Sequence, residues 1–170
     1  VIGVDEVPMR RAAALAAGAD HVIDPKAGDV KAQLHAWLGS KGTEVVADAT
    51  GVPAAIPTAM SLACDGGQVV VVGSPRGKAA EVNFYDDLHR RYIEVTGAHG
   101  NMLFEPAHIR LAGTWDLHKA QTWLLAALHT GRLSLDGLIT HRIAPEQLGE
   151  AYEGLLKDKD HYLGVVMRWK

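Results

Sequence analysis

Asp5 has the residue type and the position to bind a ribose. It ends the apolar run VIGVD (1–5) and comes shortly before a segment of helical spacing that begins at Pro8. At the carboxyl end of a strand in a nucleotide-binding sheet, an acid accepts hydrogen bonds from the hydroxyls of the adenine ribose, and its charge repels a 2′-phosphate. That chemistry favours NAD over NADP. An equally simple interpretation is that Asp5, like Glu6, interacts with the dipole of the following helix.

The glycine-rich turn that should accompany such an acid is absent from the sequence. A G-x-G-x-x-G turn, whose backbone N–H groups hold a pyrophosphate, would stand about 20 residues before Asp5. No two glycines in the chain are separated by a single residue. Because the turn would lie before Val1, we expect the chain to be a fragment of a longer protein.

Two further strand ends carry small residues that suit a dinucleotide crevice. The segments ATG (49–51) and VGS (72–74) each follow an apolar run. Ligands of open α/β sheets bind at the carboxyl ends of the strands, so Thr50 and Gly51 are candidate contacts. Glycines at strand ends also serve tight turns alone. The joint placement of the two segments is what indicates a site.

Histidine and cysteine form no compact metal-binding pattern in this sequence. The chain has nine histidines and one cysteine, Cys64, and it contains neither H-E-x-x-H nor C-x-x-C. His99, in GAHG (97–100), is the one histidine placed at the expected crevice. No P-loop and no Ser-His-Asp arrangement is visible. We therefore predict no metal ligand and no catalytic residue in this chain.

Composition excludes several classes of partner. The chain of 170 residues is 48% hydrophobic and 22% charged, with a formal net charge of −3, as in ordinary globular domains. It is not basic enough for a nucleic-acid footprint, and no apolar run approaches the ~18 residues of a membrane span. A single cysteine allows no internal disulfide and favours a reducing, cytoplasmic setting.

Strands and helices alternate along the first 100 residues. The sequence predicts strands at 1–5, 21–24, 44–51, 66–73 and 92–98. It predicts helices from Pro8 to a stop at Gly18, over about 28–38, and from Pro53 to about Cys64. Continuously apolar strands are typical of a parallel sheet covered on both faces. The alternation therefore predicts an α/β fold with a doubly wound parallel sheet.

The pattern changes after residue 100. A loop with Pro106 and Trp115 precedes a helix over about 116–130, which Asp116 should cap and Gly131 should stop. We then expect a strand at 138–143, a helix from about 145 to 157 and a final strand at 163–169.

Four segments, taken in order, resemble landmarks of the zinc-dependent medium-chain alcohol dehydrogenases, nearest to the sorbitol and threonine dehydrogenase branch. They are 1–25, VVADATG (45–51), GGQVVVVGSPRG (66–77) and the stretch from LITHRI to LGVV (138–166). The resemblance implies a Rossmann sheet that lacks its first strand and its glycine-rich turn. It divides the chain into a partial NAD-binding domain (1–130) and a C-terminal segment (131–170) that would pack on a catalytic domain outside this chain.

The resemblance also implies cofactor contacts. Asp5 would hold the adenine ribose, Arg10 would lie beside the adenosine, and Arg168 is similar to an arginine that reaches the pyrophosphate in some members. Six residues would contact the nicotinamide half, the last three of them through backbone groups: Val72, Gly73, Ser74, Ala98, His99 and Gly100.

As a member of that family, the parent enzyme would transfer hydride between NAD and a secondary alcohol or polyol. Its zinc would be held by an N-terminal domain and not by these residues, so the fragment alone should be inactive. The region from His99 to Trp115 would contribute to the substrate pocket. The full-length protein would be a homo-oligomer, with the strand at 92–98 as a possible pairing edge.

The absent first strand would lie between the strands at 1–5 and 44–51. We therefore expect a gap or an abnormal pairing there, and an isolated chain that is unstable or aggregates. Two other functions stay open. A methyltransferase also places an acid after its second strand, although its sheet should end in an antiparallel hairpin. A non-catalytic nucleotide-binding module is the other.

Overall fold

The computed structural model describes residues 1–79, 81–100 and 116–169. The strands are β1 (Ile2–Val4), β2 (His21–Ile23), β3 (Thr43–Asp48), β4 (Ala63–Val71), β5 (Glu94–Gly97), β6 (Ile139–Ile143) and β7 (Gly164–Met167). The α-helices are α1 (Pro8–Ala16), α2 (Val30–Leu38), α3 (Ala55–Leu62), α5 (Leu117–His129) and α6 (Leu148–Lys157). Short helical turns are η1 (Gly39–Lys41), η2 (Phe84–His89) and η4 (Pro145–Gln147). The predicted elements are confirmed with small shifts at their ends, and the loop with Pro106 and Trp115 lies outside the described residues.

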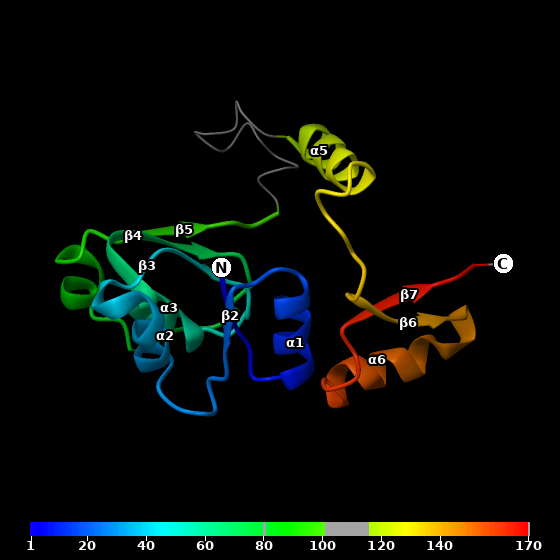
Figure 1. Cartoon of the computed structure of the whole chain (residues 1–170), viewed down its shortest axis with the longest axis horizontal. Helices are drawn as coiled ribbons and strands as arrows, with labels where there is room; N and C mark the ends of the chain where they lie inside the picture. The colour runs from blue at the N-terminus through cyan, green and yellow to red at the C-terminus, as the bar shows by residue number, and fades with distance from the viewer. Residues whose placement is uncertain (80, 101–115, 170) are drawn as a thin grey trace. The chain divides into compact units, whose positions relative to one another are not determined.

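All the strand pairs are parallel, as predicted, but they form three separate sheets. These are β1-β2, β3-β4-β5 and β6-β7 (Figure 1). In the described part of the chain no ladder joins β1 to β3, and the gap or abnormal pairing expected there stays a prediction. The mixed α/β class with parallel sheets is confirmed.

The chain forms two compact units, residues 1–30 with 126–170 and residues 31–125. The predicted domain boundary after residue 130 was defined against a domain outside this chain. Contacts within the chain do not test it, and it stays a prediction. None of the helices among the described residues has the length and apolar character needed to cross a membrane.

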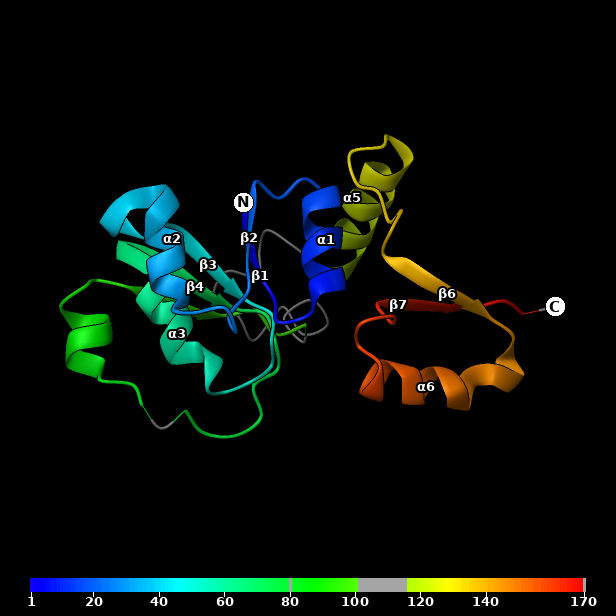
Figure 2. The same cartoon turned by 60° about the horizontal axis from the view of Figure 1, so that its bottom comes forward.

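In the unit of residues 31–125, the core lies between the β3-β4-β5 sheet and α3. Figure 2 shows α3 lying along β3 and β4. Val69 in β4 is fully buried, and Met60 of α3 and Ile93 pack into the same cluster. The outer strands are more open, because Val45 of β3 is 59% exposed and Val95 of β5 is 41% exposed. In this sheet only the central strand, β4, has side chains as deeply buried as a parallel sheet covered on both faces requires.

Arg91 joins the end of α3 to the start of β4. Its Nη1 donates to the carbonyl of Met60 at 2.9 Å, its Nη2 donates to the carbonyl of Ala63, and its Nε pairs with Asp65 at 2.9 Å. Helix C-termini leave carbonyls without intrahelical partners, so this guanidinium satisfies groups that would otherwise lack donors.

In the other unit, α1 packs beside the β1-β2 pair and ends as the sequence predicts. Gly18 has a φ of +100° and donates its N–H to the carbonyl of Leu15 at 3.0 Å. Ala19 donates to Ala14 at 3.0 Å, which completes a Schellman motif. Arg11 then ties the strand ends to the helix, because its guanidinium reaches the carbonyl of Asp5 and the carboxylate of Asp24, each at 2.8 Å.

The C-terminal part of this unit is a parallel β6-α6-β7 motif. The ring of Tyr162 stacks on His141 with centroids 3.8 Å apart and planes within 7°. The same ring lies over Gly154 of α6, where a Cβ would overlap it. Gly149, five residues earlier in α6, has open space at its Cβ position. The two glycines of one helix therefore have opposite steric surroundings.

These surroundings predict opposite effects of alanine on stability. Gly154→Ala should lower the free energy of unfolding by about 1–3 kcal/mol, because the added methyl displaces the Tyr162 ring from its stack. Gly149→Ala should raise it by up to about 1 kcal/mol, because alanine is the better helix former. Urea unfolding of both variants measures this, and equal effects would contradict the assigned packing of Tyr162.

Candidate functional site

The parallel register brings three of the predicted segments to one edge of the β3-β4-β5 sheet. Asp48 pairs with Val71, and Val71 pairs with Gly97, so β3, β4 and β5 end at the same level. Ala98 continues the ladder by donating its N–H to the carbonyl of Val71 at 2.9 Å. The segments 49–51, 72–74 and 98–100 follow directly. The predicted candidates in these segments therefore leave the sheet at its carboxyl edge, where α/β proteins bind ligands.

The ATG and VGS segments contact each other through their backbones. Gly73 lies so close to Gly51 that a Cβ on Gly73 would overlap the Gly51 nitrogen and lie 2.9 Å from its Cα. Gly51 has a φ of +69°, which L residues with side chains rarely adopt, and it faces the backbone of Ser74. Both glycines are required by this contact, one for its missing Cβ and one for its backbone conformation.

Asp48, at the end of β3, connects these two segments. Its carbonyl accepts the N–H groups of Val72 and Gly73, both at 2.8 Å. Its Oδ1 accepts the hydroxyl of Thr50 at 2.7 Å and the N–H of Thr50 at 3.2 Å. The Thr50 hydroxyl oxygen in turn accepts the N–H of Val52 at 3.1 Å. One residue thus fixes the conformation of both strand ends.

Asp48 is not among the site residues predicted from the sequence. It is the one charged residue in VVADATG and it is only 5% exposed. A carboxylate directly after an apolar strand core was the signal that could have found it, because charged groups are seldom buried without partners.

Asp5 follows β1 in the other unit and is half-buried. Its Oδ1 accepts the N–H of Val7 at 2.8 Å, just before α1 begins at Pro8. This hydrogen bond orients the carboxylate at the helix N-terminus. It is compatible both with ribose binding and with the helix-dipole interpretation, so the role of Asp5 stays a prediction.

Two other residues predicted for the adenine and pyrophosphate side have separate environments. Arg10 lies in α1, and its buried Nε has no hydrogen-bond partner within the described residues. It is Arg11, not Arg10, whose guanidinium contacts the Asp5 carbonyl. Arg168 follows β7 with an exposed side chain, and its N–H donates to the carbonyl of Ile143 at 2.9 Å.

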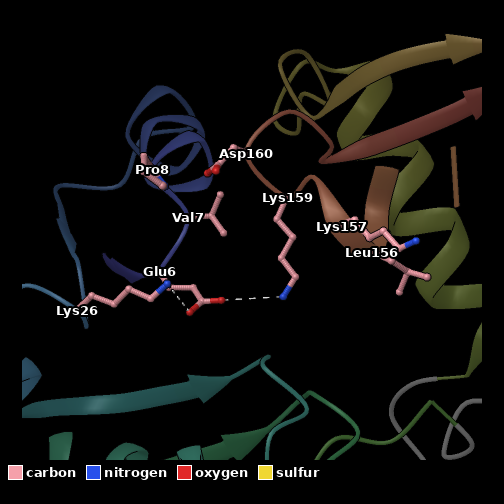
Figure 3. A pocket seen from close by; sticks show the side chains of 8 residues that line it. All are labelled: Glu6, Val7, Pro8, Lys26, Leu156, Lys157, Lys159 and Asp160. Atoms are coloured by element: carbon pink, nitrogen blue, oxygen red, sulfur yellow. Dashed lines mark ion pairs between the residues drawn. The ribbon is translucent and has the colours of Figure 1, made fainter. Parts of the chain in front are cut away.

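A shallow depression of about 390 Å³ lies beside Glu6 (Figure 3). Glu6 pairs with Lys26 at 3.1 Å and with Lys159 at 4.0 Å. The hydrogen bond from Lys26, with its positive charge, lowers the pKa of Glu6 below its ordinary value. Most of the lining side chains are charged and exposed. Small-molecule sites have mainly apolar walls, so this depression is not a candidate site.

The residues that the structure describes do not fit a zinc site. Protein zinc sites use three or four Cys, His or acidic ligands converging on one point. Among the described residues no three such side chains come together, and the half-buried Cys64 is the chain's single cysteine.

Residues 1–113 match the family model described as zinc-binding dehydrogenase. The chain belongs to this family. It is 30% identical over 168 residues to L-galactonate-5-dehydrogenase of Escherichia coli, covering 98% of this chain and 44% of that protein. It is 26% identical over 157 residues to L-threonine 3-dehydrogenase of Bacillus licheniformis, covering 92% of this chain and 41% of that protein. The chain thus spans less than half the length of these relatives.

Solved dehydrogenase structures share the fold. Benzyl alcohol dehydrogenase of Acinetobacter calcoaceticus superposes with a TM-score of 0.80 at 22% identity, over 99% of this chain and 42% of that one. 2R,3R-butanediol dehydrogenase of Bacillus subtilis gives 0.78 at 24% identity, over 99% and 43%. The resemblance predicted from the sequence is confirmed, and the methyltransferase and the non-catalytic module are not supported.

The contact between the strand-end segments predicts a selective effect of a single methyl group. Gly73→Ala should lower the free energy of unfolding by about 1–3 kcal/mol, because its Cβ meets backbone atoms that no side-chain rotation can move away. Gly97→Ala is the matched control, because nothing lies within 4 Å of the Cβ position of Gly97 in the same sheet. Thermal unfolding of both variants checks this, and equal losses would contradict the described contact.

Proposed function

We propose that this chain is the cofactor-binding part of an NAD-dependent dehydrogenase that acts on a secondary alcohol or polyol. Membership of the zinc-binding dehydrogenase family supports the reaction class. The observation that carries the proposal is the common end of β3, β4 and β5, with two glycine-containing segments in backbone contact at that edge. Such an edge lets a flat ligand approach the backbone closely.

In this proposal the two halves of NAD meet different residues. The carboxylate of Asp5 accepts hydrogen bonds from the adenine ribose, Arg10 lies beside the adenosine, and Arg168 reaches the pyrophosphate. The nicotinamide half is lined by Val72, Gly73 and Ser74, and backbone groups of Ala98, His99 and Gly100 contact its carboxamide. Bound NAD would supply the hydride acceptor. Because the described residues do not fit a zinc site, no step of the reaction is assigned to a metal that they hold.

Three finer points belong to the same proposal. The substrate is a small alcohol. Its pocket is expected to include the region from His99 to Trp115, of which residues 101–115 lie outside the described residues. A cytoplasmic location is supported by the single cysteine. A homo-oligomer paired along β5 is supported by its position as the outer strand of its sheet.

The proposed function predicts selective nucleotide binding. The purified protein should be retained on immobilised adenine nucleotide and released by NAD, but not by S-adenosylmethionine. The retained fraction and the competitor concentration for half release are the quantities to measure. Release by S-adenosylmethionine alone would contradict the dehydrogenase assignment.

Asp5 should decide between NAD and NADP. Asp5→Ala should weaken NADH binding about tenfold or more, because hydrogen bonds to a charged group contribute about 1.5–3 kcal/mol. It should weaken NADPH binding less, because the repelling charge is gone. Glu6→Gln is the control, since Glu6 pairs with lysines at the surface. Fluorescence titration with both dinucleotides measures the ratio, and an unchanged ratio would favour the helix-dipole interpretation.

A further inference from the structure

The side chain of Asp48 is a buried charge whose hydrogen bonding is incomplete. It is 5% exposed, and its Oδ2 is buried without a hydrogen-bond partner in the part of the chain that the structure describes. A buried carboxylate costs free energy unless its oxygens are compensated. Only Oδ1 is compensated, through Thr50.

The contacts of Asp48 with Thr50 do not require a charge. An asparagine side chain also offers one carbonyl oxygen that accepts the Thr50 N–H and hydroxyl. The backbone carbonyl that binds Val72 and Gly73 is independent of the side chain. A neutral residue could therefore hold the two segments equally well, without the cost of burying a charge. The negative charge itself is left without a structural use.

The position of this charge suggests what it acts on. The backbone carbonyl of Asp48 accepts the N–H of Gly73, and its carboxylate accepts the N–H and hydroxyl of Thr50, so the charge lies at the base of the two strand-end segments. Gly73 is one of the residues proposed to line the nicotinamide half of the cofactor. The nicotinamide ring carries a positive charge in NAD⁺ and none in NADH. In a partly desolvated site, with an effective dielectric constant near 20, one nearby charge changes affinities by severalfold or more.

We propose that Asp48 determines the redox-state preference of the cofactor site: its buried carboxylate stabilises the cationic nicotinamide of NAD⁺ relative to the neutral ring of NADH. The inference rests on the proposed function. Asp48 positions Thr50 through its hydrogen bonds. Its negative charge also creates an electrostatic potential at the strand-end segments. The carboxylate takes no part in a covalent step.

The test compares dissociation constants of NAD⁺, NADH and AMP, measured by calorimetry on the purified protein. Asp48→Asn should weaken NAD⁺ binding about fivefold or more through the lost charge. NADH and AMP binding should stay within about twofold, and the melting temperature should not fall, because a neutral group replaces a buried charge. A purely structural role would weaken both dinucleotides together.

Three further variants keep the outcome interpretable. Thr50→Val retains the charge but removes the hydroxyl, so it should weaken NAD⁺ and NADH equally. Glu44→Gln removes an exposed acid at the other end of β3 and should change none of the three constants. Asp48→Ser should repeat the changed NAD⁺ to NADH ratio if Asp48→Asn fails to fold.

The outcomes separate the two proposals. If the unaltered protein binds neither dinucleotide, the proposed function is wrong and the inference falls with it. If the unaltered protein binds both, and neutral residues at position 48 leave the ratio of the NAD⁺ and NADH constants unchanged, the proposed function stands and the inference about Asp48 is overturned.

Discussion

The backbone contact between Gly51 and Gly73 is the constraint on which the candidate site depends. It exists because β3 and β4 end at the same level and because neither residue carries a side chain at the point of approach. Asp48 stabilises this contact, because its backbone carbonyl binds the VGS segment and its carboxylate binds Thr50 of the ATG segment. Rigid backbone groups at a sheet edge suit a ligand that is recognised mainly through its flat surface and its amide.

The same fold leaves its outer strands incompletely covered. β1 and β3 are both terminal strands of their sheets, and Val45 of β3 is 59% exposed. Unpaired apolar strand edges favour intermolecular pairing. Within each unit, local contacts such as the Arg91 hydrogen bonds and the Schellman motif at Gly18 stabilise the segments that they join.

Membership of the zinc-binding dehydrogenase family and the absence of a fitting zinc site in the described residues are compatible. The match covers residues 1–113, and the chain spans less than half the length of its relatives, so the family match does not require a zinc site within these residues. The hydrogen bonds of Asp48 do not explain why this buried residue carries a charge. Its electrostatic effect would act on the cofactor and not on the alcohol.

The sequence by itself determined the local structure. Pro8, Gly18 and Gly131 marked helix ends, and continuous apolar runs marked parallel strands, because these signals depend on neighbouring residues and on hydrophobic periodicity. It also placed ATG and VGS at strand ends. Only the tertiary structure decided that these two segments touch, that Arg11 holds the Asp5 carbonyl, and that Asp48 is buried. Each of these depends on strand register and on side-chain packing between residues distant in sequence, which no local pattern encodes.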